Sequence, residues 1–209
     1  MSGYQDFIKL FRAGSYVSSK DISAKYSLPK ALSSVYIVPT FFRGVYYVPT
    51  ERERAGHFIE KPEEFFFNLF NFVYGRRSWY WALSTAARRY GLEWSSTKLI
   101  EIIALGSSKR VAGKRVDIAA RTVALGKKSS YRSKILRKML VSLEVNILLI
   151  HPGKKSFFKD VKIDDRIGPI AGKERLRKDL TFFRPRTKNL VLRRLYLRIE
   201  RESEERKGK

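Results

Sequence analysis

The sequence contains no cysteine. Disulfide bonds, cysteine-ligated zinc and thiol catalysis are therefore excluded. It has only two histidines, His57 and His151, and neither has a partner at the spacing that metal sites use. The sequence also lacks a glycine-rich phosphate-binding loop and a nucleophile elbow. These absences predict a protein that is not an enzyme and that uses neither a metal nor a cofactor.

Long apolar runs are absent too. The densest aliphatic run, Ile147–Ile150, is stopped by His151-Pro152-Gly153. It is far shorter than the roughly 20 residues that a helix needs to cross a bilayer. Residues 1–10 include Asp6 and Lys9 and do not resemble a signal peptide. We therefore expect a cytoplasmic protein that does not bind a membrane.

Acidic residues are scarce beside basic ones. The chain of 209 residues has 44 Lys and Arg against 20 Asp and Glu, a net charge of +24. Residues 1–60 hold 8 basic and 5 acidic residues (net +3), and residues 61–209 hold 36 and 15 (net +21). Nucleic acid is the usual partner of such a charge. A single glutamine, Gln5, among so many charges also indicates a thermophilic source, which would explain part of the charge.

The first part of the chain has the pattern of a winged helix-turn-helix domain. Hydrophobic spacing and helix caps predict helices over residues 4–13, 18–26 and 28–36. Two β-rich runs, 36–38 and 45–48, then predict a hairpin. Three helices followed by a two-stranded wing are typical of the winged helix-turn-helix.

This pattern predicts which side chains contact double-stranded DNA. The second helix of the pair enters the major groove, and the first turn of the preceding helix can hold a phosphate. The wing tip reaches an adjacent groove or the backbone. The alternative is that the same residues are ordinary surface residues of a fold used for protein contact. The candidates in this domain are Ser18, Ser19, Lys20, Ser27, Lys30, Ser33, Ser34 and Arg43.

The rest of the chain predicts a mixed α/β domain, which makes the whole protein α+β. Residues 51–61 are charged and are interpreted as a linker or a domain edge, and the predicted domains are 1–58 and 59–209. Residues 135–150 fit either a helix or strands, with strands favoured at their end. Helices are predicted over 62–74 and 78–90, β-rich strands over 98–105 and 115–125 with a turn at 106–113, and a weak helix from Leu190.

A second surface for nucleic acid is predicted in the basic part of this domain. Residues 109–159 hold 14 basic residues and only two acids, Asp117 and Glu144. Two alternatives to DNA regulation stay open. One is a basic RNA-binding or ribosome-associated protein, and the other is a metal-dependent nuclease built on Glu101, Asp117 and Asp164-Asp165. The basic candidates are Lys109 and Arg110 in the turn, and the cluster Lys127, Lys128, Arg132, Lys134, Arg137 and Lys138.

Two segments resemble the AbiEi-type antitoxins, the DNA-binding partners in type IV toxin–antitoxin systems. The first is Gly14–Pro49, above all Arg43-Gly44-Val45-Tyr46-Tyr47-Val48-Pro49, where glycine permits a tight turn and the tyrosines fit a strand. The second is Tyr80–Ala87 continuing to Tyr90-Gly91-Leu92, similar to the helix that follows the linker in that family. The strand pair predicted after the second segment is also similar, so the resemblance extends over about the first 125 residues.

The resemblance implies a transcriptional regulator that represses its own operator and opposes a nucleotidyltransferase-like toxin. On this basis Lys30, Ser33, Ser34 and Arg43 match the DNA-reading positions. A homodimer is expected, since such regulators usually bind palindromic sites. The chain departs from the family after residue 126, where a basic segment stands in place of the expected acidic, leucine-rich one. This departure puts toxin neutralisation in doubt more than DNA binding.

Overall fold

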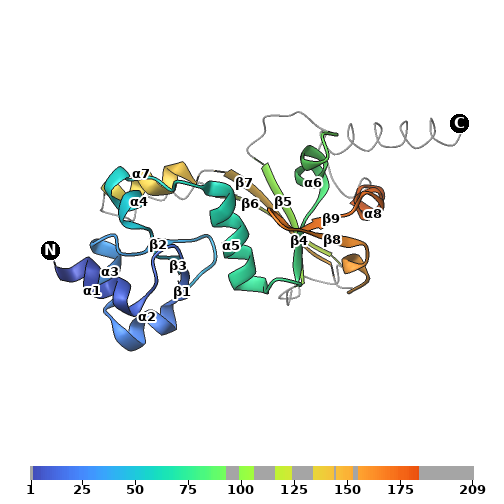
Figure 1. Cartoon of the computed structure of the whole chain (residues 1–209). Coiled ribbons are helices and arrows are strands. Elements are labelled where there is room, and N and C mark those ends of the chain that lie inside the picture. The colour runs from blue at the N-terminus through green and yellow to red at the C-terminus, as the bar shows by residue number, and fades with distance from the viewer. Residues whose placement is uncertain are drawn as a thin grey trace, which may run out of the picture. The chain divides into compact units, whose positions relative to one another are not determined.

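The computed structural model shows a mixed α+β protein, as the sequence predicts (Figure 1). The internal contacts divide the chain into two compact units. Unit 1 comprises Met1–Phe72 and Thr122–Val145, and unit 2 comprises Val73–Arg121 and Asn146–Lys209. The structure describes residues 2–92, 99–105, 116–123, 134–143, 145–152 and 155–183.

Unit 1 contains a three-stranded antiparallel sheet with short helices around it. The strand order is β1-β3-β2, with Tyr16 and Val38 both opposite Tyr47. The three helices and the hairpin expected from the sequence are present, and β1 is an additional strand. The elements are α1 (Ser2–Leu10), β1 (Tyr16–Ser18), α2 (Ser19–Lys25), α3 (Leu28–Ser33), β2 (Val38–Pro39), β3 (Val45–Tyr47), α4 (Glu51–Gly56), α5 (Pro62–Tyr74) and α7 (Lys134–Ser142).

Side-chain caps define the two central helices. Ser18 caps α2 in a reciprocal capping box with Asp21, and Ser27 caps α3. The third helix ends at Ser33, earlier than the sequence predicted, which placed its end near residue 36. The chain cannot continue the helix, because Val35 adopts the left-handed conformation (φ 53°).

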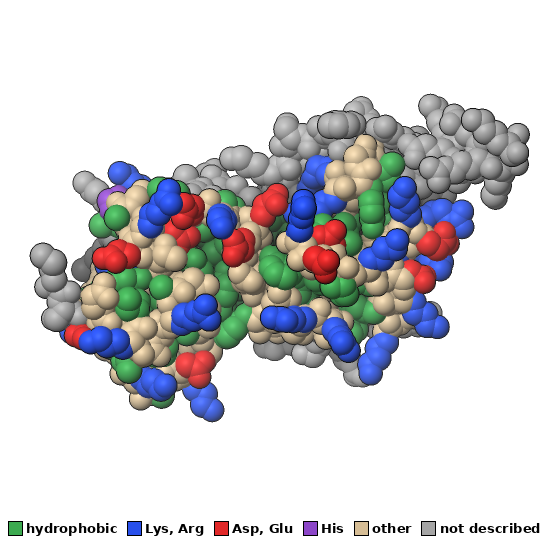
Figure 2. Space-filling model, viewed as in Figure 1, with side chains coloured by type: hydrophobic (Ala, Val, Ile, Leu, Met, Phe, Trp, Pro, Cys, Tyr) green, Lys and Arg blue, Asp and Glu red, His purple; other side chains and the backbone are tan. Residues whose placement is uncertain are grey.

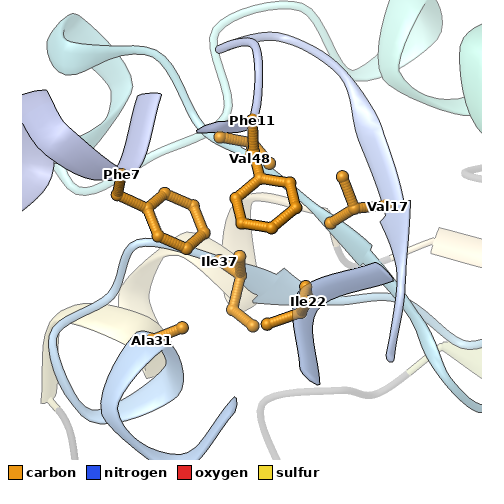
Figure 3. Close-up of a cluster of buried hydrophobic side chains, with 7 residues drawn as sticks. All are labelled: Phe7, Phe11, Val17, Ile22, Ala31, Ile37 and Val48. Carbon is orange, nitrogen blue, oxygen red and sulfur yellow. The ribbon is translucent and has the colours of Figure 1, made fainter. Parts of the chain in front are cut away.

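The core of unit 1 forms where α1, the helix pair and the sheet meet. Seven buried hydrophobic side chains gather there, as Figure 3 shows. Leu10 does not join this core, because α1 ends at this residue and its side chain is 46% exposed. In α3 the fully buried residue is Ala31, while Leu28 and Leu32 are only half-buried. The seven are Phe7, Phe11, Val17, Ile22, Ala31, Ile37 and Val48.

The interpretation of residues 51–61 as a linker is wrong, because α4 lies within them. Thr50 and Glu53 form a capping box: the Thr50 hydroxyl accepts from the Glu53 N–H (3.2 Å), and the Glu53 carboxylate accepts from the Thr50 N–H (2.8 Å). Glu53 is buried and also accepts from the Tyr47 hydroxyl at 2.9 Å. The next helix, α5, buries one face rather than its whole circumference, since Phe72 is 45% exposed.

Unit 2 is built on a six-stranded mixed sheet in the order β6-β7-β5-β4-β9-β8. Strand β4 pairs antiparallel with β5 and parallel with β9, β5 pairs parallel with β7, and β8 pairs antiparallel with β9. Helices α6 and α8 contact each other and the sheet. The elements are β4 (Trp79–Trp81), α6 (Leu83–Arg89), β5 (Leu99–Ala104), β6 (Val116–Val123), β7 (Val145–Pro152), a 3₁₀ turn (Lys155–Phe158), β8 (Val161–Asp164), β9 (Gly168–Ala171) and α8 (Lys173–Phe183).

Several sequence predictions for this unit need correction. The predicted helix 78–90 begins instead as strand β4, whose three bulky aromatic residues are all buried in the sheet. Strands β5 and β6 exist, but β7 lies between them, so they do not form a hairpin. Residues 135–150, for which helix and strands were both left open, form a helix and then a strand, and the strand lies at the end where it was favoured. The turn 106–113 and the tail from Leu190 lie outside the described residues.

Candidate nucleic-acid interface

The helix pair and the hairpin of unit 1 are joined through their backbones. Only two residues, Tyr26 and Ser27, separate α2 from α3. The hairpin turns tightly, with the Thr40 N–H donating to the Val45 carbonyl at 3.1 Å. At the tip, the Gly44 carbonyl accepts from the Ser19 N–H at 2.7 Å. This bond brings the wing tip to the first turn of α2, so the backbones of Lys20 and Arg43 start from neighbouring positions.

Gly44 at the wing tip should not tolerate a side chain. Its φ is +78°, and an added Cβ would lie 3.1 Å from the Ser19 hydroxyl oxygen. We expect Gly44→Ala to lower the free energy of unfolding by roughly 1–2 kcal/mol for the left-handed backbone, plus the cost of the close contact. Gly14→Ala is the matched control, because Gly14 has φ +76° with no atom within 4 Å of the added Cβ. Equal losses for the two variants in urea denaturation would contradict a packed wing tip.

Charge in unit 1 is polarised along the chain. Residues 12–50, which form the helix pair and hairpin, hold five basic residues and one acid, whereas residues 51–64 hold five acids and three basic residues. The single acid, Asp21, is engaged with Ser18, and these hydrogen bonds lower its pKa. On the face drawn in Figure 2, basic side chains are dispersed among acidic ones rather than joined in one patch. The five basic residues, all exposed, are Arg12, Lys20, Lys25, Lys30 and Arg43.

Most of the predicted serines hold the helices themselves. The Ser18 hydroxyl donates to the Asp21 carboxylate (2.6 Å) and accepts from its N–H (3.1 Å). The Ser27 hydroxyl accepts from the Lys30 N–H (3.4 Å), and the Ser33 hydroxyl donates to the Lys30 carbonyl (3.1 Å). A hydroxyl has one proton to donate, and for Ser18 and Ser33 it is already used. The charged side chains are therefore the groups best able to bind an anionic ligand.

Arg54 fixes the end of α3, a role that sequence reasoning missed. Its guanidinium lies 3.8 Å from the centre of the Tyr4 ring and donates to the carbonyls of Val35 (3.0 Å) and Ser34 (3.3 Å). Ser34, predicted as a DNA contact, is thus half-buried at this junction. Thr50 and Glu53 are three residues apart, which is the spacing of a capping box at the start of a helix. This spacing is the local signal that could have placed Arg54 on a helix.

The structure describes few of the remaining predicted residues. Lys109 and Arg110 lie outside the described residues, and in the cluster 127–138 only Lys138 has a described, exposed basic side chain. Asp164 is exposed and accepts from the backbone N–H groups of Arg166 and Ile167. Within the described residues, no three His, Asp or Glu side chains are grouped so that they could hold a metal ion. The same residues include no helix long and apolar enough to cross a membrane.

Glu101, considered above as a nuclease residue, is fully buried on β5. One carboxylate oxygen accepts from the Ser84 hydroxyl and from the Thr85 N–H, and the other has no hydrogen-bond partner in the described part of the chain. Burial raises the pKa of Glu101 to about 7, although the hydrogen bonds from Ser84 and Thr85 oppose the rise. The carboxyl group is therefore enclosed by α6 and the sheet rather than presented to a substrate.

This raised pKa predicts a pH-dependent stability. The unfolded chain releases the Glu101 proton at about pH 4.5, whereas the folded protein keeps it up to about pH 7. The contribution of Glu101 to the free energy of unfolding is therefore full below pH 4.5 and is lost as pH rises through about 7. We expect the difference in unfolding free energy between Glu101→Gln and the wild type to change by about 3 kcal/mol between pH 4.5 and 8, in favour of the variant. Urea denaturation at a series of pH values measures it. Parallel pH profiles for the two proteins would refute the assignment.

Comparisons with protein-family models, with curated proteins and with solved structures found no significant match. The candidate interface is therefore described by its own geometry and charge. It consists of the first turn of α2, the exposed side of α3 and the tip of the hairpin, with Lys20, Lys30 and Arg43 as its charged groups.

Proposed function

We propose that unit 1 is a winged helix-turn-helix that binds double-stranded DNA sequence-specifically. The observation that carries the proposal is the element order α1-β1-α2-α3-β2-β3 with the antiparallel strand order β1-β3-β2. A two-residue connection between α2 and α3 and a hairpin tied to the start of α2 are compatible with this architecture. The basic character of residues 12–50 gives the same elements the sign of charge that DNA requires.

The three charged groups have different roles in this proposal. Lys30, on the exposed side of α3, reads base edges in the major groove, where lysine contacts the guanine acceptors. Lys20 and Arg43, whose backbones adjoin, bind phosphates and set the register on the duplex. Helix α3 has only six residues, so few side chains can reach bases, and phosphate contacts supply most of the affinity.

In the cell, the protein acts as a transcriptional regulator that represses its own operator, in the manner of an antitoxin. The resemblance of Gly14–Pro49 to the AbiEi-type antitoxins supports this proposal. The basic segment after residue 126 differs from the acidic one of that family. A stand-alone regulator therefore fits the sequence as well as one with a cognate toxin.

Selection from a random-sequence duplex pool tests sequence-specific binding. The full chain should enrich one motif over successive rounds, and that motif should occur upstream of its own coding sequence. A Lys30→Ala variant should enrich a motif with relaxed preference at the bases that Lys30 contacts, because contacts to bases determine which sequence is preferred and contacts to phosphates do not. A pool that stays random would contradict the proposal.

A basic RNA-binding or ribosome-associated protein is the second candidate. It rests on the net charge of +21 in residues 61–209. In the described part of unit 2, exposed basic side chains include Arg76, Arg77, Lys155, Lys159 and Lys173. Preferential binding of structured RNA over duplex DNA would favour this candidate. Magnesium-dependent cleavage that is lost on Asp117→Ala would instead support a nuclease.

A further inference from the structure

Strand β8 is an exposed edge of the sheet in unit 2. It is the last strand in the order β6-β7-β5-β4-β9-β8, and β9 is its neighbour on one side (Figure 1). Lys162, Ile163 and Asp164 are all exposed, and Ile163 is 66% exposed, the most of any large hydrophobic residue that the structure describes. An edge strand carries a row of backbone groups that can pair with another strand.

The pairing with β9 shows which backbone groups of β8 point outward. In an antiparallel ladder, hydrogen-bonded and non-hydrogen-bonded residue pairs alternate. The Gly172 N–H donates to the Asp160 carbonyl at 3.0 Å, so this pair is bonded, and the Lys162–Ile170 pair is bonded too. Ile163 lies opposite Pro169, which has no N–H to give. The N–H and carbonyl of Ile163 therefore point to the free edge.

We propose that β8 pairs with β8 of a second copy of this chain, antiparallel, with the twofold axis at Ile163. The two Ile163 residues then exchange two backbone hydrogen bonds and place their exposed side chains together. Lys162 lies opposite Asp164 of the partner subunit, and Asp164 lies opposite Lys162 of the partner subunit. These are non-hydrogen-bonded pairs, in which opposite side chains approach most closely.

Charge selects this register over its neighbours. Shifting the axis to Lys162 would place the two Lys162 side chains opposite each other, and like charges directly opposite are destabilising. Shifting it to Val161 would require Asp160 to extend the strand. Asp160 cannot do so, because its φ is +66° and its carboxylate is paired with Lys178 at 3.1 Å. No ion pair of Lys162 or Asp164 occurs within the described residues. One Asp164 oxygen, Oδ1, accepts from the N–H groups of Arg166 and Ile167, so its other oxygen, Oδ2, would face the partner's Lys162.

The contact is short, because β8 has four residues and the Asp164–Ile167 turn ends it. A contact of this size is smaller than that of a permanent dimer, so we expect a reversible dimer with a dissociation constant in the micromolar range or weaker. The inference does not rest on the proposed DNA binding, and it is tested on the protein alone. It supplies the twofold symmetry with which a dimeric regulator would meet a palindromic site.

Sedimentation velocity over a wide range of protein concentration tests the dimer. The wild type should shift from monomer to dimer as concentration rises. Ile163→Pro removes the outward N–H together with the exposed isoleucine side chain, and it leaves the ladder to β9 intact, since proline is tolerated at an edge position of this kind. It should keep the thermal midpoint nearly unchanged and should remain monomeric.

Lys162→Glu tests the charge pairs by a second route that keeps every backbone group. The substitution places a carboxylate opposite the partner's Asp164 twice in the dimer and should weaken association at least tenfold, the equivalent of about 1.4 kcal/mol. Lys159→Glu is the matched control, an equal charge change on an exposed lysine outside β8, and should leave the dimer intact. A wild type that stays monomeric at every concentration would overturn the proposal. So would a dimer that withstands both Ile163→Pro and Lys162→Glu.

Discussion

The double variant Lys30→Glu/Arg43→Glu should lose roughly a hundredfold or more in affinity for the preferred duplex. Both side chains are exposed, one on α3 and one at the wing tip. Each substitution removes a favourable contact and sets a negative charge against the DNA backbone. Because Arg43 contacts a phosphate whereas Lys30 contacts a base edge, one neutralised phosphate is lost, and the slope of log affinity against log salt should become shallower by about 1. Fluorescence anisotropy at several salt concentrations measures both quantities.

Lys9→Glu/Lys61→Glu is the matched control for this experiment. It changes the net charge of unit 1 by the same amount at two exposed lysines outside the interface, each paired with a nearby acid: Lys9 with Asp6 (3.2 Å) and Lys61 with Glu64 (3.4 Å). We expect its loss of affinity to be several-fold smaller than the loss in the interface variant, because long-range charge is screened within about 10 Å at ordinary salt. Equal losses in the two double variants would show that binding depends on net charge and not on this surface.

Arg175→Met should lower the free energy of unfolding by about 3–5 kcal/mol. Arg175 is buried and forms a close ion pair with Asp179, which is fully buried and also accepts from the Tyr80 hydroxyl at 3.0 Å. The guanidinium lies 4.9 Å from the centre of the Phe157 ring and donates to the Ser156 carbonyl. Removing it leaves the Asp179 carboxylate buried without its cation, which is why the expected loss is large.

Burial raises the pKa of Asp179 to about 6, although Arg175 opposes the rise. Without Arg175 the carboxyl group should become protonated more readily, so the deficit of the variant should shrink as pH falls from 8 to 5. The matched control is Arg177→Met, since Arg177 lies on the same helix but is half exposed beside Glu174. It should cost less than about 1 kcal/mol. A similar loss for both variants would mean that the buried pair is not the source of the effect.

The helices of unit 1 could be predicted because their signals are local. Ser18, Ser27 and the glycine at the hairpin tip stand at caps and turns whose residue preferences follow from nearby backbone geometry. The same reasoning failed at α4, where charged residues were interpreted as a linker although Thr50 and Glu53 have the spacing of a capping box. Strand β1 was missed because three residues are too few to show a periodicity.

Unit 2 was less predictable because its arrangement depends on contacts distant in the sequence. The position of β7 between β5 and β6 follows from how the strands assemble, which no local pattern encodes. The run Trp79-Tyr80-Trp81 lies next to a helix, and the helical signal of the residues after it was extended over the strand.

The candidate interface was predictable in its residue types but not in its assembly. Lys20 and Arg43 are 23 positions apart in the sequence. The pairing of β1 with β3 and the bond between the Ser19 N–H and the Gly44 carbonyl bring their backbones together. Ser18 and Ser27 were predicted to contact DNA. In the structure their hydroxyls form hydrogen bonds within the helices. The charged side chains are therefore the better candidates for contact with DNA.

The most direct test of the proposed function is a salt titration of binding to three probes: the DNA upstream of the protein's own coding sequence, a scrambled duplex of equal length, and a structured RNA. Counterion release weakens all three as salt rises, so the differences between them carry the information. We predict that the upstream duplex binds about a hundredfold or more tightly than the other two at physiological salt. If the three affinities instead fall together at every salt concentration, unit 1 does not read sequence, and the protein is a general binder of nucleic acid.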